Sequence, residues 1–242
     1  MKKLDLSDHR AQRAYLTNED FALAPDAEFV PKGTISEESW SAITLLPDTV
    51  ALMTTDWYFS AIGTMQRIVN AWLEIHDAMP ENSPMRSQCL AAHECYEGGL
   101  FNAVHGWYRL AGIALRNAVE DIIIGLYYEH HPELGAEFVA VTSGKQRSPR
   151  RDLLDSELLN YAPQSLVKAI NDLYQAELSI YVHRTSDGGL WQSNGPVFVH
   201  EQLETWIDQF ERSFRLLCEL IEAVVKGSGT IAVSNSIQFT TS

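Results

Sequence analysis

The chain lacks any apolar run that approaches the roughly 18 residues a membrane-spanning helix needs. Its first residues include two lysines, but no apolar segment follows them, so the pattern of a secretory signal is missing as well. From these absences we expect a cytoplasmic protein that does not attach to membranes.

Cysteine is also scarce. Cys89, Cys95 and Cys218 are an odd number of thiols, and they lie in segments with helical patterns, as is typical of free thiols in a reducing compartment. The sequence contains no CxxC pair, no HExxH motif and no glycine-rich phosphate loop. We therefore expect neither a cofactor nor a metal site. A carboxylate–histidine metal cluster between helices remains a remote third reading of the chain.

Positive charge is in short supply. The chain has 18 Lys and Arg against 32 Asp and Glu, which gives a formal net charge of −14. Such a chain is a poor general binder of nucleic acid, because it is repelled by phosphate before contact forms. One local exception is the basic stretch from Lys145 to Arg151, which we interpret as a solvated loop rather than a phosphate-binding patch.

Helical periodicity dominates the rest of the chain. We predict a single-domain, all-α bundle of five to seven helices over residues 36–227, after an extended N-terminal arm (1–35) and before a short tail (228–242). Prolines and glycines set the expected boundaries. The expected helices cover residues 36–47, 48–79, 84–97, 98–128, 133–142, 164–183 and 201–225, and at Gly98–Gly99 the third helix either kinks or passes straight into the fourth. The last helix has the clearest apolar stripe, formed by Leu203, Trp206, Ile207, Phe210, Phe214, Leu217, Ile221 and Val224.

The predicted helix over residues 98–128 is the most informative. It is apolar on nearly every side, but His105, Arg109, Arg116 and Glu120 fall within one narrow arc at 100° per residue. Charges on such a helix are costly to bury and need partners. The line is interpreted first as an ion-pair network that fixes helix packing, and second as an anion site that uses the fork geometry of arginine.

The predicted helix over residues 164–183 has an apolar face centred on Tyr174, and a second polar face lies opposite. The other residues of the apolar face are Val167, Ile170, Leu178 and Tyr181. Ser179 and His183 are one turn apart, but this spacing on one helix does not build a nucleophile elbow or an oxyanion hole, so the spacing does not favour a serine triad. Ser179 and Asn194 are instead candidate binding residues, together with Arg109 and His105. His183 is the nearest partner that we can name for Arg116 and Glu120. The aromatic residues Trp107, Tyr108, Tyr127 and Tyr128 are interpreted as core.

Three segments of the chain resemble a group of uncharacterised bacterial all-helical proteins and, more distantly, the HEPN superfamily. They are Gly106-Trp-Tyr-Arg-Leu-Ala with Leu115-Arg-Asn-Ala-Val-Glu120, Leu173-Tyr-Gln-Ala-Glu-Leu-Ser-Ile-Tyr-Val-His183, and Trp191-Gln-Ser-Asn-Gly-Pro196. The resemblance implies a helical bundle that dimerises, and a setting in toxin–antitoxin or phage-defence systems, where many relatives are ribonucleases or their inactive relatives.

The catalytic Arg-x4–6-His of such ribonucleases lies on one helix, whereas here Arg116 and His183 lie on different helices. Only Arg86 and His93 fit that spacing. The leading hypothesis is a helical interaction module that acts as a homo-oligomer or with a protein partner in a bacterial defence or stress system. The alternative is a metal-independent ribonuclease acting on RNA. In that case Arg116 would stabilise phosphate, and His183 would act as acid or base, oriented by Glu120.

Overall fold

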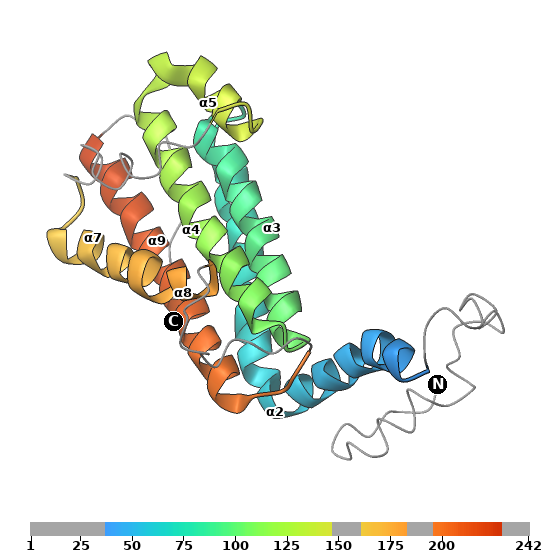
Figure 1. The fold of residues 1–242 in the computed structure, drawn as a ribbon. Coiled ribbons are helices and arrows are strands. Elements are labelled where there is room, and N and C mark those ends of the chain that lie inside the picture. Colours follow the sequence, from blue (N-terminus) through green and yellow to red (C-terminus); the bar gives the residue numbers. More distant parts are fainter. Residues whose placement is uncertain (1–36, 147–160, 183–195, 229–242) are drawn as a thin grey trace.

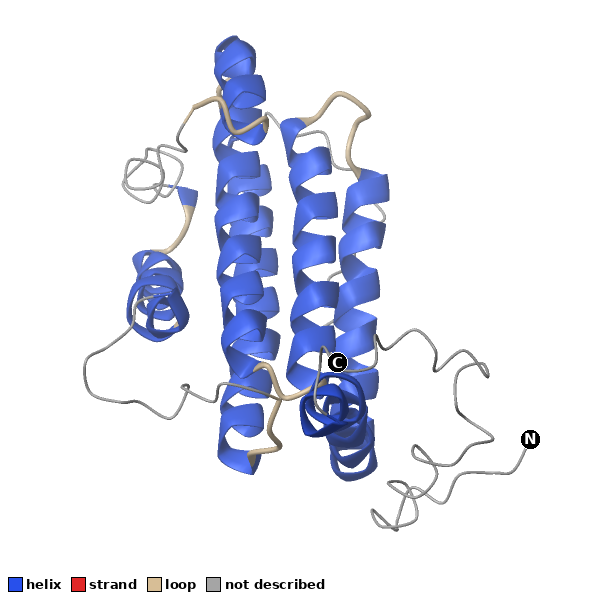
Figure 2. Cartoon of the chain, turned by 45° about the vertical axis from the view of Figure 1, so that its right-hand side comes forward, coloured by secondary structure: helices blue, strands red, loops and turns tan. Residues whose placement is uncertain are grey.

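The computed structural model describes residues 37–146, 161–182 and 196–228, and this part of the chain is helical without any strand (Figures 1 and 2). The prediction of an all-α bundle is therefore confirmed. The predicted arm and nearly all of the predicted tail lie outside the described residues. The elements are α2 (Glu37–Ala78), α3 (Pro84–Val104), α4 (Tyr108–His130), η3 (Pro132–Leu134), α5 (Gly135–Thr142), α7 (Gln164–Asn171), η5 (Asp172–Glu177), α8 (Ser179–Val182) and α9 (His200–Ser228).

Four long helices form the body of the molecule. The second half of α2 runs beside α3, α3 packs most extensively against α4, and α9 lies against α4 (Figure 1). The short elements α7, η5 and α8, which we call the crossing segment (residues 164–182), lie against α4 and α9. Within the described residues, no helix is both long and apolar enough to cross a membrane.

The core is rich in aromatic rings contributed by different helices. The Trp72 and Tyr96 ring centroids are 5.5 Å apart, and the Tyr96 and Phe210 centroids are 4.7 Å apart in an edge-on contact. The hydroxyl of Tyr96 lies 2.7 Å from Ser213 Oγ, so its polar end is satisfied inside the core. The predicted apolar stripe of the last helix is confirmed, because six of its residues are buried and the other two, Ile207 and Phe214, are half-buried against the core. The six are Leu203, Trp206, Phe210, Leu217, Ile221 and Val224.

The first long helix differs from prediction. The expected end at Pro47 is wrong, since α2 continues through this proline to Ala78. Its interruption lies instead at Tyr58, whose backbone leaves helical geometry (φ −123°, ψ 25°). The Tyr58 hydroxyl donates to Glu204 Oε1 at 3.0 Å, so a tertiary contact with α9 accompanies the kink. Residues 37–57 consequently leave the bundle as a projecting half-helix (Figure 1).

The prediction of one helix over residues 98–128 is also wrong. Helix α3 continues through Gly98 and Gly99 to Val104, and the chain then reverses before α4 begins at Tyr108. Gly106 makes the reversal with φ 78°, a left-handed conformation that suits glycine. The Gly106 carbonyl accepts a hydrogen bond from the Val197 amide at 3.5 Å. Because of this turn, His105 belongs to the end of α3 and Arg109 to the start of α4.

The predicted helix over residues 164–183 is present in three parts. After α7 the chain widens into the π-helical turn η5, where the Leu178 amide donates to the Leu173 carbonyl at 2.8 Å, and α8 follows. Single π-turns within helices are often found at functional sites. The predicted apolar face is confirmed, since Ile170, Tyr174, Leu178 and Tyr181 are buried.

Candidate functional site

One face of α4 forms a seam with the crossing segment. Arg109, Gly112, Arg116 and Glu120 recur every three or four residues along this face, so they lie in one row. At one end, Arg109 Nε donates to the carbonyl of Tyr181 at 2.9 Å. That carbonyl is in the last turn of α8, where carbonyl groups lack helical partners and a cation is favourable.

Close packing defines the middle of the seam. A Cβ atom on Gly112 would lie 2.2 Å from Tyr181 Cγ, so only glycine lets the tyrosine ring approach α4 this closely. The ring is fully buried, and its hydroxyl donates to Gln209 Oε1 at 2.7 Å. Tyr181 therefore joins α4 and α9 through one side chain, and it has little freedom to move.

Tyr174 connects the two charged residues at the other end of the seam. The Arg116 guanidinium carbon lies 4.2 Å from the centroid of the Tyr174 ring, a cation–π geometry. The Tyr174 hydroxyl donates to Glu120 Oε2 at 3.1 Å. Arg116 and Glu120 thus meet through Tyr174, which sits in the π-turn. The sequence did not indicate Tyr174 as a site residue, because its position on the apolar face of the helix predicts a core residue.

Arg116 is unusual among the charged residues that the structure describes. Its Nε is buried and has no hydrogen-bond partner, and the guanidinium forms no ion pair with any described residue. Glu120, only 8% exposed, accepts the tyrosine hydrogen bond. A stacked guanidinium without a carboxylate partner keeps donors available for an anion.

The other candidate residues are not brought to this seam. His105 ends α3, where its Nδ1 lies 2.7 Å from the Phe101 carbonyl and its ring stacks on Phe101 with centroids 4.1 Å apart. The Ser179 hydroxyl donates to the Gln175 carbonyl in its own helical segment. His183 and Asn194 lie outside the described residues.

We expect Tyr174→Phe to lower the free energy of unfolding by about 1–2 kcal/mol, because Glu120 loses a hydrogen-bond donor while buried. The ring beneath Arg116 is retained in this variant. Tyr127→Phe is the matched control, because the Tyr127 hydroxyl makes no hydrogen bond within the described residues. Urea denaturation of the two variants measures the difference, and equal midpoints would contradict a stabilising role of the Tyr174 hydroxyl.

A second region stands out at the end of the bundle where α3 meets α4. Segments distant in sequence converge there, since the Trp57 ring lies 5.0 Å from the His200 ring and Val197 contacts Gly106. Five large apolar side chains are exposed in these segments, and together we call them the aromatic end. They are Trp57 (59% exposed), Phe59 (75%), Phe101 (62%), Trp107 (42%) and Leu110 (44%).

The sequence prediction missed the aromatic end. Trp107 was expected in the core with Tyr108, and this is wrong for Trp107 but confirmed for Tyr108, which is buried. A signal was available in the run Trp57-Tyr58-Phe59, because consecutive residues on a helix cannot all face one side. Tyr58 points to α9, and its two aromatic neighbours are left exposed.

A polar contact holds the aromatic end in place. The Tyr58 hydroxyl, which donates to Glu204, also lies 2.9 Å from His200 Nδ1. Burial and the neighbouring Glu204 carboxylate raise the pKa of Tyr58 to about 12, so the phenol stays protonated and can donate. The kink of α2 is thereby fixed to the first turn of α9, on which Trp57 also packs.

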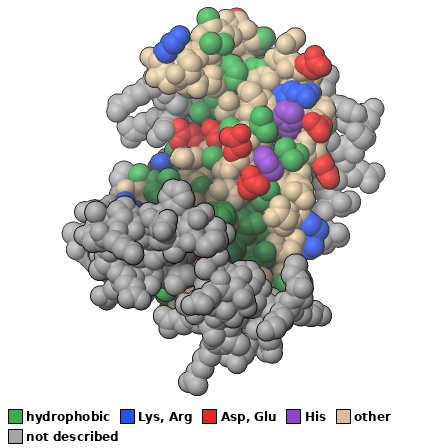
Figure 3. Space-filling model, turned by 90° about the vertical axis from the view of Figure 1, so that its right-hand side faces the viewer, with side chains coloured by type: hydrophobic (Ala, Val, Ile, Leu, Met, Phe, Trp, Pro, Cys, Tyr) green, Lys and Arg blue, Asp and Glu red, His purple; other side chains and the backbone are tan. Residues whose placement is uncertain are grey.

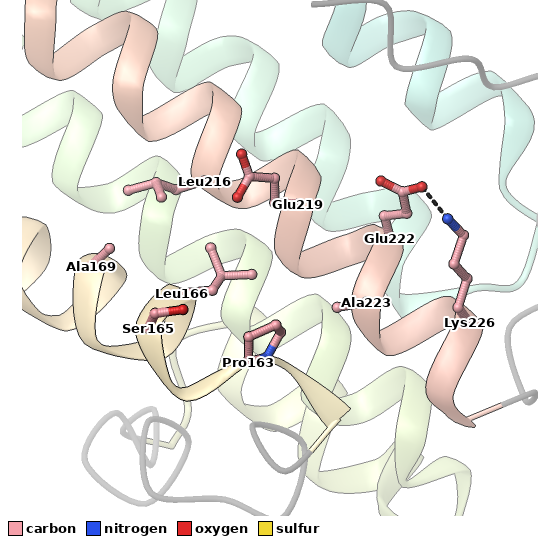
Figure 4. Close-up of a pocket in the computed structure, with 9 residues that line it drawn as sticks. All are labelled: Pro163, Ser165, Leu166, Ala169, Leu216, Glu219, Glu222, Ala223 and Lys226. Carbon is pink, nitrogen blue, oxygen red and sulfur yellow. Dashed lines mark hydrogen bonds and ion pairs between the residues drawn. The ribbon is translucent and has the colours of Figure 1, made fainter.

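A shallow groove lies between α7 and α9, on another part of the molecule (Figure 4). It encloses about 450 Å³, and Leu166 and Leu216 contribute to its apolar walls. Glu219 and Glu222 line its α9 side, where Glu222 pairs with Lys226 one turn away. None of the candidate residues predicted from the sequence lines this groove.

Thiol and metal chemistry find little support in the described part of the chain. All three cysteines are free, and burial raises the pKa of both Cys89 and Cys95 to about 12, so they remain thiols near neutral pH. No group of three or more His, Cys, Asp or Glu side chains among the described residues is placed to hold a metal ion.

Comparison of the chain with protein-family models, curated proteins and solved structures found no match.

Proposed function

We propose that this protein is a helical interaction module that binds a protein partner or a second copy of itself through the aromatic end. The observation that carries the proposal is the exposure of five large apolar side chains at one end of the bundle. Several large apolar side chains exposed in one region are typical of interaction surfaces in globular proteins. Tryptophan is also among the residues that contribute most to binding energy.

The rigidity of the aromatic end supports the same proposal. Trp57 packs edge-on against His200, and Tyr58 next to it is bonded to Glu204. Phe101 stacks on His105 within α3. Side chains held on helices before binding lose less conformational entropy when a partner arrives, so more of the contact energy appears as affinity.

A pair of double variants tests the proposal. We expect Trp57→Ser/Phe101→Ser to abolish self-association in sedimentation velocity, or to lose a partner that the wild type retains in affinity capture. The control Leu90→Ser/Val139→Ser also removes two exposed apolar side chains, but away from the aromatic end. Both variants should keep wild-type stability to within about 1 kcal/mol, since exposed substitutions cost little. Identical association of the wild type and the aromatic variant would refute the proposal.

The proposed biological setting is a bacterial defence or stress system, with a HEPN-like fold. It rests on the resemblance of the three segments that begin at Gly106, Leu173 and Trp191.

The second candidate function is a metal-independent ribonuclease, and Arg116 is the observation that favours it. Its guanidinium has no anionic partner in the described part of the chain, so it could stabilise a phosphate, with Glu120 orienting His183. An assay of RNA cleavage tests this function. The ribonuclease function would be supported if Arg116→Ala or His183→Ala abolishes RNA cleavage and the exposed control Arg67→Ala retains it. Absence of cleavage by the wild type would eliminate it.

A further inference from the structure

We infer that the aromatic end takes a partner segment that combines large apolar side chains with lysine or arginine, in preference to a second copy of this chain. The inference rests on the proposed function and adds the chemistry of the partner. Its basis is the charge of the side chains that surround the exposed rings.

Carboxylates border the aromatic end on three helices. Glu97 is exposed one helical turn before Phe101, on the same face of α3. Asp56 precedes Trp57 in α2, and Glu201 follows His200 at the start of α9. None of these three carboxylates forms an ion pair with a described residue, so each can receive a cation from a partner.

Figure 3 views the molecule from the side that carries α2 and α3. Carboxylates gather around histidine side chains in the upper part of this face, on the side away from the α3–α4 turn. At the aromatic end itself, exposed rings together with the three carboxylates named above would complement a segment whose apolar and basic side chains alternate at helical spacing.

Little positive charge offsets these carboxylates. Arg109 is exposed between Trp107 and Leu110, and its guanidinium, which donates to the neutral Tyr181 carbonyl, offsets one of the three carboxylates. Arg67 lies more than two helical turns beyond Phe59 along α2, where it bonds Thr64. Counted over the described residues, the aromatic end therefore carries more carboxylates than cations, and the chain as a whole has a net charge of −14.

A second copy is the poorer occupant for the same reason. In a two-fold contact each copy presents the same patch, so a surface that bears Asp56, Glu97 and Glu201 would meet a second surface with the same carboxylates. Like charges across an interface disfavour association, whereas opposite charges accelerate encounter and select the partner. A basic amphipathic segment gains from both the rings and the carboxylates.

Isothermal titration calorimetry of the full chain with two synthetic helical peptides tests the inference. One peptide consists of leucine and lysine, and the other has glutamate in place of lysine in the same pattern. We expect the leucine–lysine peptide to bind and the leucine–glutamate peptide not to bind. Trp57→Ser/Phe101→Ser should weaken binding by about tenfold or more, as expected for the loss of hot-spot residues. Affinity should also fall as salt rises.

Glu97→Lys and Glu81→Lys form a matched pair for the charge. Both positions are exposed and both changes alter net charge equally, but Glu81 lies in the turn between α2 and α3, at the opposite end of the bundle. We expect Glu97→Lys to lower the affinity for the leucine–lysine peptide by about fivefold to tenfold. Glu81→Lys should lower this affinity by less than about twofold, because salt screens the interaction between distant charges.

The outcomes separate this inference from the proposed function. Equal binding of the two peptides, or equal effects of Glu97→Lys and Glu81→Lys, would overturn the inferred partner chemistry. If the leucine–lysine peptide fails to bind while the wild type self-associates and Trp57→Ser/Phe101→Ser does not, the occupant is a second copy and the interaction module stands. If Trp57→Ser/Phe101→Ser keeps both self-association and binding of the leucine–lysine peptide, the result contradicts both the inferred partner chemistry and the proposed interaction module.

Discussion

Gly112→Ala is expected to destabilise the protein by about 3 kcal/mol, the upper part of the usual cost of overpacking a core. The new methyl group would lie 2.2 Å from Tyr181 Cγ and 2.3 Å from Cδ2, well inside van der Waals contact. Relief requires movement of the tyrosine ring, which is fully buried and bonded to Gln209. Chemical denaturation followed by circular dichroism measures the loss.

The control for this prediction is Gly98→Ala in the middle of α3. Nothing lies within 4 Å of the Cβ position at Gly98, so only helix propensity changes, and we expect a gain of about 0.5–1 kcal/mol. The double variant Gly112→Ala/Tyr181→Leu should cost less than the sum of the single variants, because a smaller side chain removes the clash. A Gly112→Ala protein as stable as Gly98→Ala would show that the seam is not closely packed.

Gly106→Ala is expected to cost a similar amount, about 3 kcal/mol, for a different reason. Gly106 has φ 78°, which disfavours a side chain, and its Cβ position lies 2.3 Å from the carbonyl oxygen of Val197. The obstacle is backbone, so it cannot rotate away as a flexible side chain could. The substitution should separate the α3–α4 turn from the segment that leads into α9, and differential scanning calorimetry should show a lower Tm.

Gly144→Ala isolates the conformational part of this effect. Gly144 has φ 70°, but nothing lies within 4 Å of its Cβ position. We expect this variant to lose about 1 kcal/mol, the cost of a left-handed conformation for an L-residue. The difference between the two variants then measures the contact of Gly106 with Val197. Equal losses would mean that this contact adds nothing to stability.

Most of the polar line that the sequence indicates makes packing contacts on α4 in the described structure. Arg109 binds the end of α8, Gly112 admits the Tyr181 ring, and Glu120 accepts from Tyr174. Each contact docks the crossing segment on α4. Arg116 is the exception, because its stack on Tyr174 leaves hydrogen-bond donors without a protein partner among the described residues. Among these residues, Arg116 is therefore the candidate for binding an anion.

Local sequence patterns were sufficient to predict the helical class and many of the buried faces. The stripe from Leu203 to Val224 and the apolar face around Tyr174 appear as predicted, because a helix with one apolar side is stable only when that side is buried. Pro84 likewise begins α3 as expected, with the Ser83 hydroxyl accepting from the Arg86 amide.

The tertiary structure alone decided where the long helices bend and reverse. A glycine permits a turn but does not require one, so Gly98 and Gly99 stay helical while Gly106 reverses the chain against Val197. Pro47 is likewise tolerated within α2, and the kink falls at Tyr58, where the side chain reaches Glu204.

The same physical reason explains why the aromatic end escaped prediction. Periodicity shows which residues share a side of a helix, but it does not show whether another helix covers that side. Trp57 and Phe101 have the character of core residues and would be buried if a neighbour lay over them. The sequence by itself therefore determined the helices and their faces, and only the packing of the helices decided that these rings are exposed.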